Sequence, residues 1–188
     1  MKRIIIGISG ASCAIIGIEL LQELRQHEDI ETHLVITKGG EVTIKEETDY
    51  SVEEVKSLAD YCHDVENMAA PVASGTFEVF GMIVAPCSMR TLAGVANGFC
   101  ENLLLRAADA TLKESRPLVL ITRETPLSTV HLKNMLAAKE AGAVILPPAL
   151  SFYNKPQTLL DSVRYIVGKA LRALGIKAKD FKGWGEQK

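Results

Sequence analysis

Short apolar runs alternate along the chain with stretches in which apolar residues recur every three or four positions. The short runs are rich in Ile, Val and Leu, which predicts five strands; they cover residues 4–8, 32–37, 82–85, 118–122 and 143–146. The longer stretches have helical periodicity and cover residues 12–26, 38–47, 52–59, 91–95, 101–114, 129–141 and 158–174. Ser51, followed three residues later by Glu54, predicts a capping box at the start of one helix.

Strands that are almost wholly apolar and separated by helices indicate a parallel sheet covered on both faces. With right-handed crossovers, such a chain forms a doubly wound, Rossmann-like α/β fold. We expect a single domain over residues 1–176, followed by a polar, glycine-rich tail at 177–188. Residues 60–76 form the longest predicted loop, and loops of that length are usually functional or covered by a partner.

The charge balance limits the partners that the chain can have. The net charge is -2, so there is no basic field to attract nucleic acid. No run approaches the roughly 20 apolar residues of a membrane span, and the apolar start is too short for a leader. We therefore expect a cytoplasmic protein that binds neither nucleic acid nor membrane.

The four cysteines show no metal-binding spacing. We interpret Cys13, Cys62 and Cys100 as small buried side chains in a reducing compartment. Cys87 has a more suggestive position, because it directly follows a strand.

Glycines, hydroxyl groups and cations follow the predicted strands. The segments concerned are residues 9–12 (SGAS), 37–40 (TKGG), 86–91 (PCSMRT), 123–126 (RETP) and 147–153 (PPALSFY). Because parallel strands bring their carboxyl ends to one edge of the sheet, these segments predict a single binding site there. Their chemistry suits a phosphorylated ligand.

Two of these segments are predicted to open helices. Gly10 and Ala11 would present free backbone amides to an anion, and Ser12 would cap the helix or bind an acceptor. Ser88 and Thr91 repeat this design. The first segment lacks the GxGxxG pattern, so it does not indicate a dinucleotide site. A helix cap without any ligand is the alternative interpretation of each segment.

Several cations could meet a phosphate group. Arg123 follows a strand and has the forked geometry that binds phosphate. Arg106 and Lys113 lie seven residues apart and so share one face of a helix, and Tyr153 follows a proline-bounded turn. The alternatives are a surface ion pair, a solvated helix face and a core aromatic side chain. The sequence has no aspartate cluster of the DDxxD type, so cations alone would meet the phosphate.

Taken together, these segments resemble the UbiX/Pad family of flavin prenyltransferases. The matching motifs run in order from the first strand to the last helix: residues 7–12 (GISGAS), 47–49 (ETD), 73–75 (ASG), 86–92 (PCSMRTL), 106–109 (RAAD), 112–114 (LKE), 116–120 (RPLVL), 123–127 (RETPL) and 152–157 (FYNKPQ). Each motif is modest alone, but their order and spacing are specific.

The resemblance implies a metal-independent FMN protein that assembles as a homododecamer with active sites where subunits meet. Such a protein joins dimethylallyl, from its monophosphate or diphosphate, to N5 and C6 of reduced FMN. The product, prenylated FMN, is the cofactor of UbiD-type decarboxylases.

The resemblance also implies roles for individual residues. The expected FMN-binding residues are Gly10, Ala11, Ser12, Thr37, Ser88, Met89, Arg90, Thr91 and Arg123. The expected prenyl-phosphate residues are Tyr153 and Lys169, with Arg106 and Lys113 acting across the subunit boundary. Glu124 is the candidate base for the C6 proton, with the departing phosphate as its rival, while Ser12 and Glu47 relay protons or orient the flavin.

This sequence departs from the family pattern at two positions. Lys169 stands where Arg is usual, which keeps the charge but loses the bidentate fork. Cys13 stands where Gly is frequent. Trp184 either covers the site or lies on the surface, and the sequence does not decide between these.

Two other functions remain open from the residues. A cysteine-decarboxylating flavoprotein shares the motifs at 96–98 and 102–104 but carries a histidine shortly before the third strand, where this chain has residues 72–75 (VASG). We interpret His63, further upstream, as a surface loop residue. A non-catalytic FMN carrier would need the flavin loops but not Arg106, Lys113, Glu124 and Tyr153.

Overall fold

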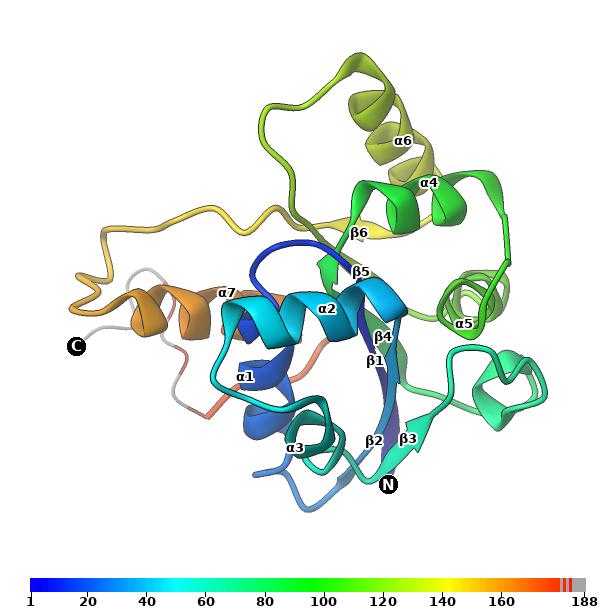
Figure 1. The fold of residues 1–188 in the computed structure, drawn as a ribbon, viewed down its shortest axis with the longest axis horizontal. Helices are drawn as coiled ribbons and strands as arrows, with labels where there is room; N and C mark the ends of the chain where they lie inside the picture. The colour runs from blue at the N-terminus through cyan, green and yellow to red at the C-terminus, as the bar shows by residue number, and fades with distance from the viewer. Residues whose placement is uncertain (180, 182, 184–188) are drawn as a thin grey trace.

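A parallel sheet forms the centre of the molecule (Figure 1). The computed structural model describes residues 1–179, 181 and 183. Within these residues the strands are β1 (Lys2–Ile8), β2 (Ile30–Ile36), β3 (Tyr61–His63), β4 (Gly81–Cys87), β5 (Leu118–Thr122) and β6 (Val144–Ile145). Their order across the sheet is β3-β2-β1-β4-β5-β6, and every described pairing is parallel.

Helices cover both faces of the sheet. They are α1 (Ile15–Leu24), α2 (Lys38–Glu47), α3 (Val52–Lys56), the 3-10 turn η1 (Pro71–Ala73), α4 (Met89–Asn97), α5 (Leu103–Lys113), α6 (Thr129–Glu140) and α7 (Leu159–Ala173). Alternate strand residues point to opposite faces. Ile4 and Ile6 of β1 pack in one core cluster with α1 and α7, whereas Ile5 packs in the other with α4 and α5. Both faces are therefore apolar, as a doubly wound fold requires.

The strand order reverses at β1. The chain moves outward from β1 to β2 and β3, then returns to the other side of β1 to form β4, β5 and β6. The crossovers on the two sides of β1 run in opposite directions, so the loops after β1 and β4 separate at the carboxyl edge. A sheet of this kind has its binding crevice at that point.

The sequence pattern predicts most elements correctly. The bounds of α2 and β5 match the predicted residues, and Ser51 and Glu54 form the predicted capping box. The fold class is confirmed. The segment 60–76 is not one loop, because it contains β3 and η1. A strand of three residues is too short to show a periodic pattern. The proposed boundary between a domain and a tail at residue 176 stays a prediction.

A stack of rings attaches β3 to β2. His33 is buried and lies parallel to Tyr61 and His63, with ring centroids 4.9 and 5.2 Å away. His33 Nε2 lies 2.9 Å from the Glu31 carboxylate, which also accepts a bond from Arg3 at 2.9 Å. A carboxylate only accepts, so Nε2 carries the proton and Nδ1 is left to accept from His63 Nε2 at 2.9 Å. The interpretation of His63 as a surface loop residue was wrong.

This stack makes the stability of the fold depend on pH. Burial is the main cause that lowers the pKa of His63 below its ordinary value of 6.5, and the electrostatic interaction with the adjacent His33 ring lowers it further. The unfolded chain binds the His63 proton more readily than the folded chain does. The contribution of this residue to the free energy of unfolding is therefore fully present above pH 6.5 and is lost as the pH falls through the folded pKa. The His33 hydrogen bond, which is the largest cause, lowers the pKa of Glu31 and extends the loss below pH 4.5.

We expect His63→Gln to flatten the pH dependence of unfolding between pH 7.5 and 5.5, because Gln can still donate to His33 but does not titrate. Urea denaturation at several pH values measures this. His131→Gln is the control, since Gln can still accept the Ser128 amide at the start of α6. A slope equal to that of the unchanged protein would contradict this account of the stack.

Candidate functional site

A cavity of about 610 Å³ lies among the loops at the carboxyl ends of the strands. Seven predicted site residues line it: Gly10, Thr37, Ser88, Met89, Arg90, Thr91 and Glu124. Lys38 and Gly39, from the predicted segment 37–40, also line it, and the lining that was not predicted comprises Val65, Glu66, Glu101, Asn102 and Leu105. The structure thus brings together residues that follow β1, β2, β3, β4 and β5.

The loops after β1 and β2 touch through their backbones. A Cβ atom built on Gly10 would lie 2.9 Å from the Cα of Gly39, closer than real contacts allow. Thr37 caps α2 by accepting the amide of Gly40 at 3.1 Å. Side chains are excluded from this contact, so the wall of the cavity is formed there by backbone groups.

A buried hydroxyl joins the loops after β1 and β4. Ser9 is 1% exposed, and its Oγ donates to the Pro86 carbonyl at 2.9 Å and accepts the Ser88 amide at 2.8 Å. Ser88 in turn caps α4 by accepting the Thr91 amide at 3.2 Å. Ser9 belongs to the predicted strand-end segment 9–12, but no role of its own was predicted for it, because its partners Pro86 and Ser88 are distant in the sequence.

Three helix N-termini contribute to the cavity lining. They belong to α2, α4 and α5, which are capped by Thr37, Ser88 and Asn102 respectively. Asn102 accepts the Leu105 amide at 3.0 Å. Each N-terminus contributes the positive end of a helix dipole, so together they favour an anion. At the start of α5, however, the Leu103 amide already donates to the Val65 carbonyl at 2.8 Å. Of these three N-termini, only that of α4 was predicted from the sequence to bind an anion. The helices α2 and α5 were predicted as well, but no role was predicted for their N-termini.

The loop after β1 differs from its prediction. Helix α1 begins at Ile15 with Ala14 at the cap position and no side-chain cap, so residues 10–12 do not open this helix as predicted, and of the two roles considered for Ser12 the structure excludes the cap. The Ala11 amide, which was expected to be free, donates to the Ser9 carbonyl at 2.8 Å. Cys13 has φ +77°, a left-handed conformation that interrupts the helix and that periodicity cannot reveal. Glu47, the last residue of α2, accepts the Cys13 amide at 2.7 Å. Ala11 and Ser12 are half-buried in this loop, outside the cavity lining.

Ion pairs lie on two walls of the cavity. Lys38 pairs with Glu66 at 3.0 Å, and this hydrogen bond raises the pKa of Lys38. Arg90 pairs with Glu101 at 2.9 Å while its side chain stays 82% exposed. Glu124 is exposed, and its carboxylate accepts the Thr125 amide at 3.0 Å.

The remaining predicted flavin residue, Arg123, follows β5. It is half-buried, and its backbone amide donates to the Cys87 carbonyl at 3.2 Å. Arg123 does not belong to the cavity lining, although its neighbour Glu124 does.

The four predicted prenyl-phosphate residues do not come together in one chain. On α5, Arg106 bonds to the Ala73 carbonyl at 3.0 Å and pairs with Asp109 at 2.7 Å, while Lys113 pairs with Glu114 at 2.9 Å. Lys169 is exposed on α7, which packs on the opposite face of the sheet from α5.

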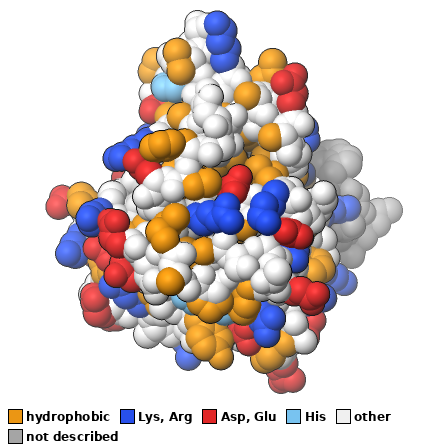
Figure 2. Space-filling model, turned by 90° about the vertical axis from the view of Figure 1, so that its right-hand side faces the viewer, with side chains coloured by type: hydrophobic (Ala, Val, Ile, Leu, Met, Phe, Trp, Pro, Cys, Tyr) orange, Lys and Arg blue, Asp and Glu red, His pale blue; other side chains and the backbone are white. Residues whose placement is uncertain are grey.

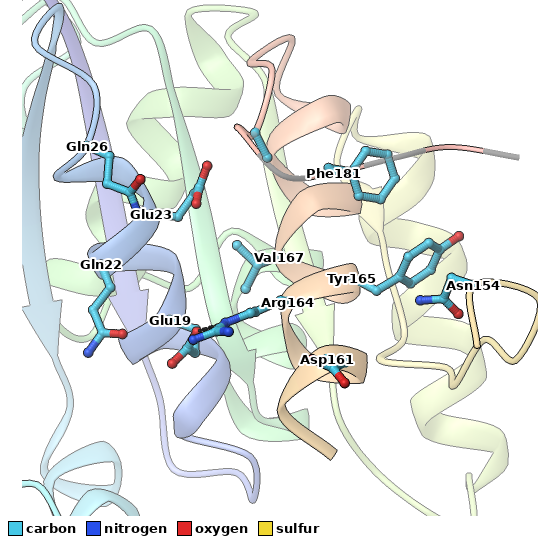
Figure 3. A pocket seen from close by; sticks show the side chains of 11 residues that line it. Glu19, Gln22, Glu23, Gln26, Asn154, Asp161, Arg164, Tyr165, Val167 and Phe181 are labelled. Carbon is cyan, nitrogen blue, oxygen red and sulfur yellow. Dashed lines mark hydrogen bonds and ion pairs between the residues drawn. The ribbon is translucent and has the colours of Figure 1, made fainter. Parts of the chain in front are cut away.

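Tyr153 lies near a second cavity. Its hydroxyl bonds to that of Tyr165 on α7. Tyr165 lines a cavity of about 680 Å³ between α1 and α7, where Arg164 pairs with Glu19 at 2.9 Å (Figure 3). The structure therefore places Tyr153 away from the first cavity.

The cysteines differ from their interpretation. Cys87 is fully buried, and burial raises its pKa far above the ordinary range, so its thiol is a packing group rather than a nucleophile. Cys62 is exposed, and Cys13 and Cys100 are half-buried. Trp184 lies outside the described residues.

The cavity chemistry suits an aromatic ligand that carries a phosphate. Val65, Met89 and Leu105 supply apolar surface, and the helix N-termini supply amides. Among the described residues, no three His, Cys, Asp or Glu side chains are grouped so that they could hold a metal ion. Within the same part of the chain, every helix is too short or too polar to cross a membrane.

Known proteins resemble the chain over nearly its whole length. The family model for flavoproteins matches residues 1–173. The flavin prenyltransferase UbiX of Escherichia coli strain K12 is 51% identical over 186 residues, which are 98% of each chain.

Two solved structures share the fold closely. AnUbiX (PadA1) in complex with FMN and dimethylallyl pyrophosphate is 49% identical, with a TM-score of 0.96 over 100% of this chain and 99% of that one. A dodecameric FMN-dependent UbiX-like decarboxylase from Escherichia coli O157:H7 is 46% identical, with a TM-score of 0.95 over 97% of this chain and 99% of that one.

We expect Ser9→Ala to lower the free energy of unfolding by about 1–3 kcal/mol, because it leaves the part-buried Ser88 amide without its acceptor and the Pro86 carbonyl with only the Ser9 backbone amide as donor. Chemical denaturation measures the change. Ser57→Ala is the control, since Ser57 is an exposed residue whose hydroxyl also bonds to a backbone carbonyl. Equal, small losses in both variants would show that Ser9 does not hold the two loops.

Proposed function

The chain belongs to the flavoprotein family and, within it, to the UbiX flavin prenyltransferases, and we propose that it joins a dimethylallyl group to N5 and C6 of reduced FMN. The donor is a dimethylallyl phosphate, and the product is prenylated FMN for a UbiD-type decarboxylase. The observation that carries this proposal is the cavity at the strand ends, where three helix N-termini, Arg90 and an apolar wall meet.

The cavity residues fit FMN as a ligand. The amides at the starts of α2 and α4, the hydroxyls of Ser88 and Thr91, and the Arg90 guanidinium suit its phosphate. Val65 and Leu105 suit the flat ring system, because they offer apolar side chains on one wall. Gly10 and Gly39 allow the loops after β1 and β2 to touch, so backbone groups form the cavity wall there.

Glu124 is the proposed base of the reaction. The bond between the allylic carbon and the phosphate oxygen breaks with its electron pair on the phosphate, while N5 forms the first new bond and gives its proton to the departing phosphate. Closing the ring joins C6 to the tertiary carbon of the alkene. One proton moves from C6 to the other carbon of that double bond. Glu124 lines the cavity and is exposed to it, so its carboxylate can carry that proton.

Glu47 and Ser12 act on the loop after β1. The Glu47 carboxylate holds the Cys13 amide, so it fixes the loop that carries Gly10, Ala11 and Ser12. The Ser12 hydroxyl is left to orient the flavin or to relay a proton. Arg123 supplies a further cation beside Glu124.

The prenyl-phosphate site is completed by other subunits of a homododecamer. In one chain, Arg106 and Lys113 lie on α5, and Lys169 lies on α7 across the sheet. Only residues from different copies can then meet around one phosphate. Together with Tyr153, they would stabilise the charge that grows on the leaving group.

Exposed apolar side chains support this assembly. Val130, Leu132 and Leu136 of α6 are all more than half exposed, as is Phe99 after α4. Figure 2 shows apolar side chains around the upper lobe, where α4 and α6 lie in Figure 1. Such patches usually mark contacts with other proteins, and one related structure is dodecameric.

A cytoplasmic location is supported by the four cysteines, which are all free.

A direct assay tests the activity. Protein, FMN reduced with dithionite and dimethylallyl monophosphate or diphosphate are combined without oxygen, and the released flavin is examined by mass spectrometry. We expect a gain of one C5 prenyl unit. Unmodified FMN with both donors would contradict the proposal and would favour a decarboxylase or an FMN carrier.

We expect Glu124→Gln to lower kcat by about 10²–10⁴-fold, the usual contribution of a general base, while the Kd for FMN stays within about two-fold. Glu53→Gln on α3 is the control, because this exposed carboxylate lies outside the cavity lining. A kcat close to that of the unchanged protein would assign proton removal to the departing phosphate instead.

A further inference from the structure

The guanidinium of Arg90 is already engaged by a carboxylate of the same cavity. Its Nη2 lies 2.9 Å from Oε1 of Glu101, which directly precedes the N-cap of α5. Both residues line the cavity at the strand ends. We propose that Glu101 competes with the flavin phosphate for Arg90 and thereby sets how fast flavin leaves the enzyme. This inference rests on the proposed function.

The charges of the cavity lining support this role. Two cations, Lys38 and Arg90, stand beside three carboxylates, Glu66, Glu101 and Glu124. A cavity built only for tight binding of a phosphate dianion would lack the surplus of negative charge. Glu124 has a proposed part in proton transfer, but Glu66 and Glu101 have none, so their contact with the cations needs another explanation.

The chemistry of the proposed reaction supplies that explanation. The flavin phosphate is unchanged between FMN and prenylated FMN, so contacts with it bind substrate and product alike. Uniform binding of this kind does not accelerate the chemical step. Tight binding would instead delay release of the product, which has to pass to another protein. A carboxylate that forms its ion pair with Arg90 again as the phosphate leaves would speed release of the product.

The geometry allows the exchange at little cost. The Arg90 side chain is 82% exposed and that of Glu101 31%, so water can solvate both groups while they separate. Exposed ion pairs of this kind contribute little to stability. Lys38 and Glu66 form a similar pair, but only arginine has the fork that binds two phosphate oxygens at once.

The test is the binding of FMN to the Glu101→Gln variant. Quenching of flavin fluorescence measures the Kd, and stopped-flow displacement measures the dissociation rate. We expect both the Kd and the dissociation rate to fall by about three- to ten-fold, because the carboxylate that competes with the phosphate for Arg90 is gone. The dependence of the Kd on salt changes as well.

Asp29→Asn is the matched control. Asp29 pairs with Lys2 at 3.2 Å, and the variant removes the same unit of charge. Lys2 begins β1 and Asp29 precedes β2, so the pair lies at the amino ends of the strands, opposite the cavity. We expect this variant to change the Kd by less than about two-fold.

A double-mutant cycle with Arg90→Gln tests whether Glu101 acts through Arg90. We expect Glu101→Gln to change the Kd by less than about two-fold in the Arg90→Gln background. An unchanged or higher Kd in Glu101→Gln alone, or an equal gain in the Arg90→Gln background, would overturn the inference. If the unchanged protein prenylates FMN in the same experiments, these results leave the proposed function intact; if it neither binds nor prenylates FMN, both fail.

Discussion

The site depends on one buried hydroxyl at the point where the strand order reverses. Ser9 connects the end of β1 to the end of β4 through bonds to Pro86 and Ser88. The crossovers diverge there, so the fold itself opens a gap. The Ser9 bonds fix the width of that gap, and Ser88 then caps α4 and aims its N-terminus at the cavity. Cation positions and ligand chemistry follow from this arrangement.

Much of the fold and one edge of the site could be predicted from the sequence. Buried parallel strands must be apolar on both faces, so β5 and its neighbours can be recognised in the sequence as short apolar runs. The loops that leave parallel strands must lie at one edge of the sheet, which brings Thr37, Ser88 and Glu124 together without any knowledge of tertiary contacts. The residues that cap α2 and α4 are Thr37 and Ser88. Such caps can be recognised from the local sequence, because a hydroxyl residue directly precedes each helix.

The missed features depend on contacts between distant segments. The three residues of β3 are held by the stack around His33, which no local pattern reveals. Ser9 is significant only because Pro86 and Ser88 are its partners. The start of α1 is displaced by the left-handed conformation of Cys13, a conformation that a non-glycine residue rarely adopts. Three of the predicted prenyl-phosphate residues are divided between α5 (Arg106 and Lys113) and α7 (Lys169), on opposite faces of the sheet, so no local pattern relates them.

The central claim is that flavin binds at the carboxyl ends of the strands with its phosphate at the start of α4. A crystal structure of this protein with FMN tests it most directly. The account predicts the phosphate within hydrogen-bonding distance of Ser88, Thr91 and Arg90, with the ring beside Leu105. A flavin bound in the cavity between α1 and α7, or a phosphate turned away from α4, would contradict it.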